Sequence, residues 1–147
     1  MRPQVRIADG SEDNGFAGML AELIRQNAED NPKKGKTLGR IRGRVAIVVE
    51  DIKVSVTLLF DESGLTVHDG IVGIPDVTIR ADSDDVTKMS LMEMAPAPFP
   101  FRGIPDPRGS TTREIFGASR TGRIRMYGAL MNLPLVGRLT RVMSVND

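Results

Sequence analysis

The chain has few side chains that could do covalent chemistry, and their spacing fits no common catalytic motif. His68 is the only histidine among the 147 residues, and there is no cysteine. Ser119 lies in Gly117-Ala-Ser-Arg-Thr-Gly122, which misses the G-x-S-x-G nucleophile elbow by one residue. Gly35-Lys36-Thr37 ends like a Walker A loop, but Asp30 stands where that motif needs its first glycine. A hydrolase built on Ser119 or His68 is therefore the least supported of the functions that we consider.

The acidic residues do not point to a metal site either. Asp82, Asp84 and Asp85 are close in sequence, and they match the acid-rich start of a helix better than a cation-binding loop. The lack of cysteine excludes disulfides and thiolate metal sites, and it fits a reducing compartment. We therefore predict a non-catalytic protein that needs no metal and no cofactor.

The apolar residues give the stronger signal. Hydrophobic residues make up 40% of the chain, but aromatic residues make up only 4%. Most of the hydrophobic residues are therefore aliphatic, and eight are Met. Methionine is flexible and repacks around variable shapes, which suits a cavity for a lipid tail or a flat polycyclic ring. An ordinary closed core is the alternative. The residues that we expect to line such a pocket are Met89, Met92, Phe99, Phe101, Ile115, Phe116, Met126, Leu130, Leu135, Leu139 and Met143.

Charge is distributed unevenly, although the net charge is only +1. Residues 33–44 carry six basic residues and no acid. Such a segment is either a solvated face or a patch that contacts phosphates or anionic lipid headgroups. The near-neutral whole does not favour a nucleic-acid partner. The N-terminus has no secretory signal pattern, and the apolar run Val45–Val49 is far shorter than the ~20 residues of a membrane span, so we expect a cytoplasmic protein.

Hydrophobic periodicity predicts an α+β domain over residues 14–147 after a flexible tail at residues 1–13. Apolar residues recur at helical spacing from Phe16 to Ile24, with Asn14 as the cap and Asn31-Pro32 as the end. The polar, basic segment 33–43 is expected to be a linker.

Four strands of an antiparallel meander are predicted next, over residues 45–50, 53–60, 65–68 and 76–81. A hairpin turn falls at residues 61–64, and the alternation places His68 on the solvent side. A helix capped by Ser83 or Asp84 is predicted to run to about Met94. A proline-rich segment at residues 95–110 is expected to be a lid at the pocket mouth rather than a polyproline ligand. The remaining predicted elements are a short helix from Thr111 or Thr112, a strand at residues 123–127 and a last helix from Asn132 or Pro134.

This order of elements resembles the sterol carrier protein-2 (SCP2-like) family over roughly residues 16–143. One motif is Asp76-Val-Thr-Ile-Arg-Ala-Asp-Ser-Asp-Asp-Val-Thr-Lys-Met89, a strand that runs into an acid-capped helix. The other is Gly122-Arg-Ile-Arg-Met-Tyr-Gly128, which is similar to the family's glycine-framed strand before its last helix. The chain departs from the family in the longer, proline-rich segment from Ala95 to Ser110. It also has Ala129 where the family often has an acid.

The resemblance implies a five-stranded, mainly antiparallel sheet covered on one face by helices, with an apolar tunnel between them. It implies a lipid-binding or lipid-transfer protein without catalysis, whose ligand is sterol-like, a fatty acid or an acyl-CoA. The alternative is a structural, protein-interaction or accessory domain of the same fold without a lipid. Transient contact with an anionic membrane surface and a homodimer remain open as further partners.

Overall fold

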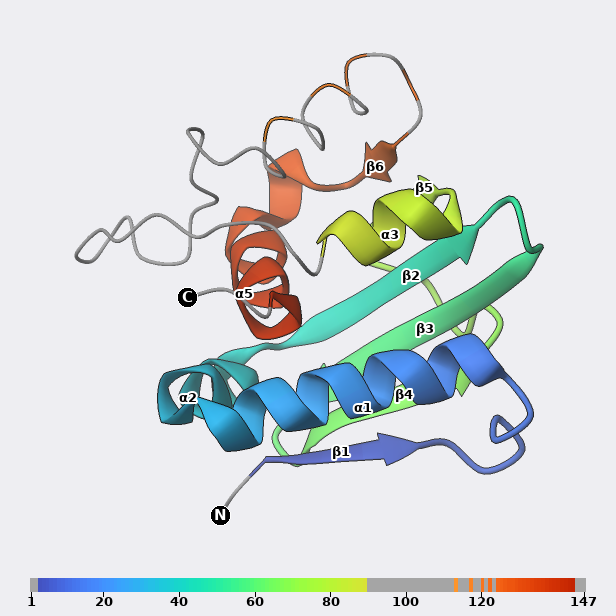
Figure 1. The fold of residues 1–147 in the computed structure, drawn as a ribbon. Coiled ribbons are helices and arrows are strands. Elements are labelled where there is room, and N and C mark those ends of the chain that lie inside the picture. Colours follow the sequence, from blue (N-terminus) through green and yellow to red (C-terminus); the bar gives the residue numbers. More distant parts are fainter. Residues whose placement is uncertain are drawn as a thin grey trace.

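A mixed sheet of six strands is the frame of the fold in the computed structural model (Figure 1). The structure describes residues 3–89, 113, 117, 120, 122 and 124–144. In the sheet the strands follow the order β1-β4-β3-β2-β5-β6. Their bounds are Gln4–Ile7 (β1), Gly43–Val49 (β2), Val54–Asp61 (β3), Gly64–Asp69 (β4), Val77–Ala81 (β5) and Arg125–Tyr127 (β6).

The centre of the sheet is the predicted antiparallel meander of β2, β3 and β4. The alternating residues Val56, Leu58 and Phe60 of β3 are buried, because their side chains all point to the helical face. The β3–β4 hairpin needs a glycine at Gly64, whose φ is 122° and where a Cβ would overlap the backbone of Gln4.

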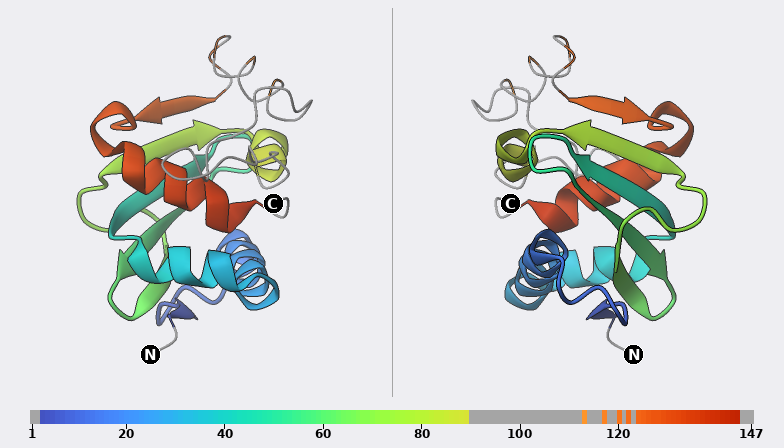
Figure 2. Two further views of the ribbon diagram at one scale, coloured as in Figure 1. Left: turned by 90° about the vertical axis from the view of Figure 1, so that its left-hand side faces the viewer. Right: turned by 90° about the vertical axis from the view of Figure 1, so that its right-hand side faces the viewer.

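The predicted meander is wrong in its fourth strand, which lies beside β2 rather than β4, and the sheet has one strand more than expected. β5 pairs with β2 in parallel, and β1 pairs with β4 in parallel. Residues 70–76 cross the face of the sheet opposite to the helices, and Figure 2 shows this crossover from two sides. The crossover returns the chain to the end of the sheet where β2 begins, so β5 runs in the same direction as β2.

The strand β1 lies where we expected a flexible tail. Backbone hydrogen bonds from Gln4 to Ser63 and from Ala8 to Val67, both 2.8 Å, fix its two ends. Val5 and Ile7 pack against the core. This short strand is ordered by pairing with β4, about 60 residues further along the chain, and local sequence does not reveal such a partner.

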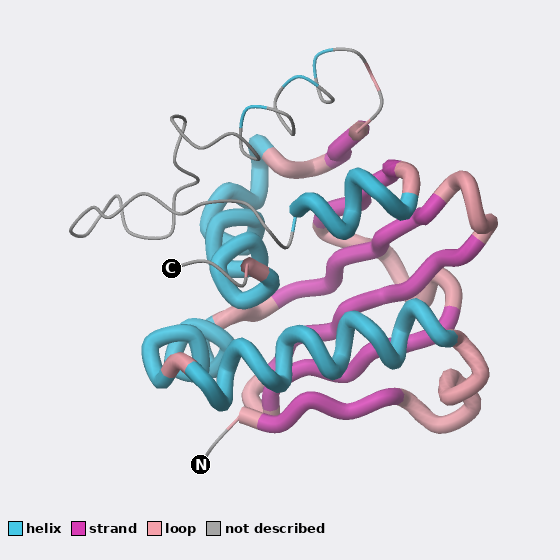
Figure 3. The backbone as a smooth tube through the Cα atoms, in the orientation of Figure 1, coloured by secondary structure: helices cyan, strands magenta, loops and turns pink. Residues whose placement is uncertain are grey.

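The described helices lie on one face of the sheet, as the fold class predicts (Figure 3). Asn14 caps the first helix by accepting a hydrogen bond from the Ala17 N–H at 3.1 Å, as expected. The helical elements are α1 (Gly15–Asp30), α2 (Pro32–Arg40), α3 (Ser83–Met89), the 3₁₀ turn η1 (Leu130–Asn132) and α5 (Leu133–Met143).

The segment expected to be a linker forms α2. Asn31 caps this helix through the Lys33 N–H at 3.0 Å, and Pro32 occupies its first turn. Leu38 is its only buried apolar side chain, and Lys34 is also buried. A single buried apolar residue does not produce the three-to-four-residue repeat of hydrophobic side chains that indicates a helix. For this reason the sequence pattern predicted a linker here.

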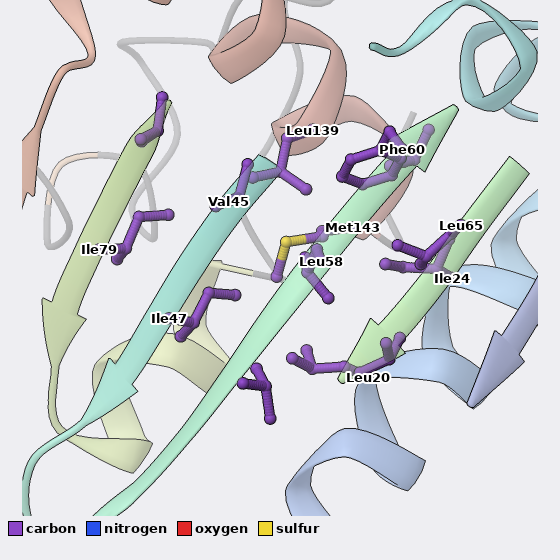
Figure 4. Packing of buried hydrophobic residues seen from close by; sticks show 14 of the residues in the cluster. Leu20, Ile24, Val45, Ile47, Leu58, Phe60, Leu65, Ile79, Leu139 and Met143 are labelled. Atoms are coloured by element: carbon purple, nitrogen blue, oxygen red, sulfur yellow. The ribbon is translucent and has the colours of Figure 1, made fainter. Parts of the chain in front are cut away.

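The core lies between the helices and the sheet (Figure 4). Leu20 and Ile24 of α1 cover the β4 side of the sheet, and Leu139 and Met143 of α5 cover its centre. The predicted continuation of α3 to Met94, the proline-rich segment 95–110 and the helix expected from Thr111 or Thr112 lie outside the described residues.

Candidate functional site

A small apolar pocket lies where α5 packs over the β5–β6 side of the sheet. Ile79 of β5 and Met126 of β6 form its floor, and four residues of α5 form its other wall, namely Val136, Leu139, Thr140 and Met143. The Thr140 hydroxyl donates to the Val136 carbonyl at 2.8 Å, so its polarity is satisfied within the helix. The pocket has a free volume of about 10 Å³, close to the smallest space that holds one water.

Three of the sequence-predicted site residues meet in this pocket, namely Met126, Leu139 and Met143. Leu135 is buried on the same helix, with its side chain beside Gly43 at the start of β2. Leu130 does not join them, because it lies in η1 with 86% of its surface exposed. Met89 ends α3, and Met92, Phe99, Phe101, Ile115 and Phe116 lie outside the described residues.

The sequence-based set omitted three lining residues. Ile79 faces inward by the period of its strand, and Val136 belongs to the apolar stripe of the last helix, so both were detectable. Thr140 carried no such signal, because threonine counts as a polar residue in the sequence pattern. Only the structure shows that its hydroxyl is hydrogen-bonded to the preceding turn of the helix and leaves an apolar surface toward the pocket.

The C-terminal end of α5 is fixed by two buried polar side chains of the first two helices. Asn27 of α1 donates from Nδ2 to the Val142 carbonyl at 2.9 Å. Lys34 of α2 donates from Nζ to the Ser144 carbonyl. Both acceptors are carbonyls at the helix end that no turn of the helix can satisfy. One wall of the pocket is therefore held by hydrogen bonds from helices that do not line it.

An ion pair lies on the exposed surface at the end of β2. The carboxylate of Glu50 accepts hydrogen bonds from Arg125 at 2.6 and 2.8 Å and lies 3.7 Å from Arg80. The hydrogen bond from Arg125 is the largest cause that lowers the pKa of Glu50 below its ordinary value. This pair joins β6 to β2 across β5, so it helps to hold the floor of the pocket.

A larger groove, with a volume of about 920 Å³, opens at the surface between β1, α1 and α2. Basic residues at its rim are Arg25, Lys36 and Arg40, and Val5 and Leu38 are among its apolar residues. None of the sequence-predicted lipid-site residues lines it. Its size is that of a ligand site, but its open, mixed lining differs from an enclosed apolar tunnel.

The candidate catalytic residues do not form a site in the described structure. His68 lies on the face of β4 opposite to Leu65 and Val67, but it is half-buried rather than solvent-facing as expected. Its Nε2 atom is buried without a hydrogen-bond partner among the described residues. Ser119 lies outside them. In the same part of the chain, no three metal-binding side chains cluster. None of the described helices has the length and apolarity needed to cross a membrane.

Comparison with known proteins gives one family. The sequence profile of the SCP-2 sterol transfer family matches residues 20–103. No curated protein sequence matches the chain.

Solved structures share the fold at low sequence identity. A structure titled "UbiJ-SCP2 Ubiquinone synthesis protein" is 16% identical, with 88% of this chain and 92% of that one covered and a TM-score of 0.59. The sterol carrier protein domain 2 of Helicoverpa armigera is 17% identical, with coverage of 92% and 91% and a TM-score of 0.53. A crystal structure of sterol carrier protein 2 is 14% identical, with coverage of 85% and 91% and a TM-score of 0.50.

Proposed function

The chain belongs to the SCP-2 sterol transfer family, and on that premise we propose that it is a non-catalytic lipid-binding protein whose ligand enters between α5 and the β5–β6 side of the sheet. The ligand classes that we propose are a sterol-like lipid, a fatty acid or an acyl-CoA. The cytoplasm is the location that we propose, because a chain without cysteine fits a reducing compartment.

The observation that carries the proposal is the composition of the pocket between β5, β6 and α5. Every lining side chain is apolar or, at Thr140, has its hydroxyl bonded within the helix. Met126 and Met143 stand on opposite walls, and methionine adapts its shape at little cost in strain. Apolar burial, at about 25 cal/mol per Å², would supply the binding free energy.

The pocket must widen for a lipid to enter. Its free volume of about 10 Å³ is far below the roughly 300–1,000 Å³ of ordinary ligand cavities. Asn27 and Lys34 hold the C-terminal end of α5, and Asn132, directly before its N-terminus, is bonded to the carbonyls of Asp76 and Gly128. The part of the wall that moves in this proposal is therefore the middle of α5. Ligand binding then separates Val136 and Leu139 from the strands beneath them.

A pair of matched variants tests the proposal with a fluorescent fatty acid as the probe. Val136→Phe fills the pocket, whereas Val72→Phe adds the same volume to a partly exposed residue of the crossover on the opposite face. We expect saturable binding that Val136→Phe weakens by more than about tenfold and Val72→Phe leaves unchanged, since about 1.4 kcal/mol of lost burial is enough for a factor of ten. Equal binding by both variants, or no saturable binding by the parent chain, contradicts the proposal.

A closed accessory domain without a lipid ligand is the second candidate, and the small free volume of the same pocket favours it. It would use its surface for a protein partner and keep its interior filled. The two candidates differ in one result, because a closed domain binds neither the fluorescent fatty acid nor unlabelled lipids.

A further inference from the structure

The edge strand β1 leaves one side of its backbone without a neighbouring strand. It is the first strand in the order of the sheet, and among the described strands only β4 pairs with it. The N–H groups of Gln4 and Ala8 donate to carbonyls of the β3–β4 hairpin, both at 2.8 Å. Because the N–H and C=O groups of successive residues alternate in direction along a strand, those of Val5 and Ile7 point away from β4. They form an outer edge to which another strand can add.

The groove of about 920 Å³ between β1, α1 and α2 reaches this outer edge at Val5. Pro3, Gln4 and Val5 form its β1 side. Its other walls are the C-terminal half of α1 and α2, which Figure 1 shows beside the start of β1. A strand that added to β1 at Val5 would therefore lie in a groove with two helices along it, rather than on an open surface.

Small residues of α2 keep the groove open on its helical side. Gly35 and Gly39, one turn apart, both line it. A Cβ at Gly35 would lie 3.2 Å from the Ala28 carbonyl oxygen, and a Cβ at Gly39 would lie 3.7 Å from Cγ of Pro3. The helix α2 therefore lies close to both α1 and β1, and it has no side chain at these two positions to fill the space between them.

The charged residues of the lining favour an acidic ligand. Three of them are basic, namely Arg25, Lys36 and Arg40, and one is acidic, Glu29. Glu22, outside the lining, forms an ion pair with Arg25 at 2.6 Å. Among the described residues no carboxylate lies within ion-pair distance of Lys36 or Arg40, and both are exposed. With every acid of the groove counted, two cations at its rim are left without an ion pair.

Arg25 shows where the outer edge can accept a partner. Its Nη2 atom donates to the outward-pointing carbonyl of Val5 at 3.3 Å, which is long for a hydrogen bond. The guanidinium thus takes the place that an N–H of a neighbouring strand would have. An added strand would replace this donor and leave Arg25 to contact an acidic side chain of the ligand.

We propose that the groove binds an extended, acidic segment of a partner protein, which adds to β1 as a further strand. Hydrogen bonds to the outer edge of Val5 and Ile7 would supply affinity for an extended backbone, and every second side chain of the segment would face the groove. Selection of acidic sequences would come from Lys36 and Arg40 at the rim. A small anion would use the same charges but not the outer edge of β1.

This groove and the apolar pocket between β5, β6 and α5 lie at opposite edges of the sheet. Peptide binding at β1 therefore does not rest on the proposed lipid-binding function. It applies equally to a closed accessory domain without a lipid.

The test is fluorescence anisotropy of a labelled peptide, Glu-Val-Glu-Val-Glu-Val-Glu, titrated with the full chain. The same peptide with Lys in place of every Glu measures the charge preference. Two further acidic peptides carry backbone N-methyl groups, one on every Glu and the other on every Val. Because only alternate N–H groups of an added strand face its neighbour, one set of methyl groups blocks strand addition and the other points to solvent.

Matched variants test the same contacts from the side of the protein. Val5→Pro removes the outward N–H and no hydrogen bond to β4, whereas Val5→Ile keeps that N–H. Lys36→Glu reverses an unpaired charge at the rim. Its control is Lys53→Glu, an exposed charge in the β2–β3 turn at the other end of the sheet. Glu29→Gln removes the carboxylate of the lining.

We expect the acidic peptide to bind at least about tenfold more tightly than the basic one. One N-methylated peptide should lose more than about tenfold in affinity and the other less than about twofold, and the same contrast should hold between Val5→Pro and Val5→Ile. Lys36→Glu should weaken binding by more than about threefold and Lys53→Glu by less than about twofold, since charges beyond a Debye length are screened. Glu29→Gln should strengthen binding. Circular dichroism confirms that each variant is folded.

Three results overturn the proposal. The first is no saturable binding of the acidic peptide at low salt. The second is equal binding of the two N-methylated peptides, which would leave only charge contacts; this result decides the matter even if Val5→Pro does not fold. The third is a dimer of the parent chain in sedimentation that Val5→Pro converts to monomer, which would assign the outer edge to a second copy of this chain. Fatty-acid binding is measured separately, so its failure is distinguishable from failure of peptide binding.

Discussion

The hydrogen bond from Asn27 to α5 gives a prediction whose size follows from the geometry. Its Nδ2 atom donates to the Val142 carbonyl at 2.9 Å in a buried setting. Replacing Asn27 by Ala removes the donor and leaves a buried carbonyl at the helix end without this partner. A buried polar group that loses its partner costs about 1–3 kcal/mol.

A smaller effect opposes this loss. Alanine is a better helix former than asparagine by up to about 0.7 kcal/mol, so the net decrease in the free energy of unfolding should be about 0.5–2.5 kcal/mol. A central value of about 1.5 kcal/mol corresponds to a decrease in Tm of about 3–6 °C for a chain of this size. Urea unfolding followed by circular dichroism measures the free energy directly.

Gln26→Ala is the matched control for Asn27→Ala. Gln26 is the neighbouring residue of the same helix, and within the described part of the chain its exposed side chain bonds to Glu22 at 3.2 Å. Its replacement should change the free energy of unfolding by less than about 0.5 kcal/mol. If the two variants unfold at the same urea concentration, the idea that Asn27 holds the wall of the pocket is refuted.

Two further predictions concern the sheet. Gly128→Ala should destabilise the fold by clearly more than Gly122→Ala, because both glycines have a φ near 80° but only at Gly128 would a Cβ overlap another backbone atom; equal urea midpoints would contradict the close approach. Glu50→Gln should flatten the pH dependence of stability in acid. The pKa of Glu50 is lowered from its ordinary 4.5, mainly by the hydrogen bond from Arg125, so its contribution is present above that value and is lost as pH falls through the lower folded pKa. Urea midpoints at neutral and acidic pH measure this, and an unchanged pH dependence would show that the ion pair adds no stability.

Much of the fold follows from local sequence period. The first helix, the meander of β2 to β4 and the last helix were predictable, because each one carries its own apolar stripe or alternation. The strand β1 and the parallel position of β5 were not, since both depend on partners far away in the chain. The helix α2 was missed because its second buried residue is Lys34, whose burial depends on a carbonyl near the other end of the chain.

At the candidate site too, residues placed by the local sequence pattern were predictable, whereas a residue placed by contacts distant in the chain was not. Met126, Leu139 and Met143 were identified from apolar period, and the structure brings them together. Leu130 has the same chemistry but lies in a 3₁₀ turn whose direction is set by the bonds of Asn132 to Asp76 and Gly128. Apolar character therefore predicted a contact for Leu130, but it could not tell an inner surface from an outer one.

Native mass spectrometry of the 16.0 kDa chain tests the lipid-binding claim most directly. The protein would be measured as purified and again after incubation with oleic acid, cholesterol and palmitoyl-CoA separately. We expect one bound lipid per chain with at least one of these probes, and loss of that complex in Val136→Phe but not in Val72→Phe. Unliganded protein alone in every sample, or equal complexes in both variants, would contradict this expectation.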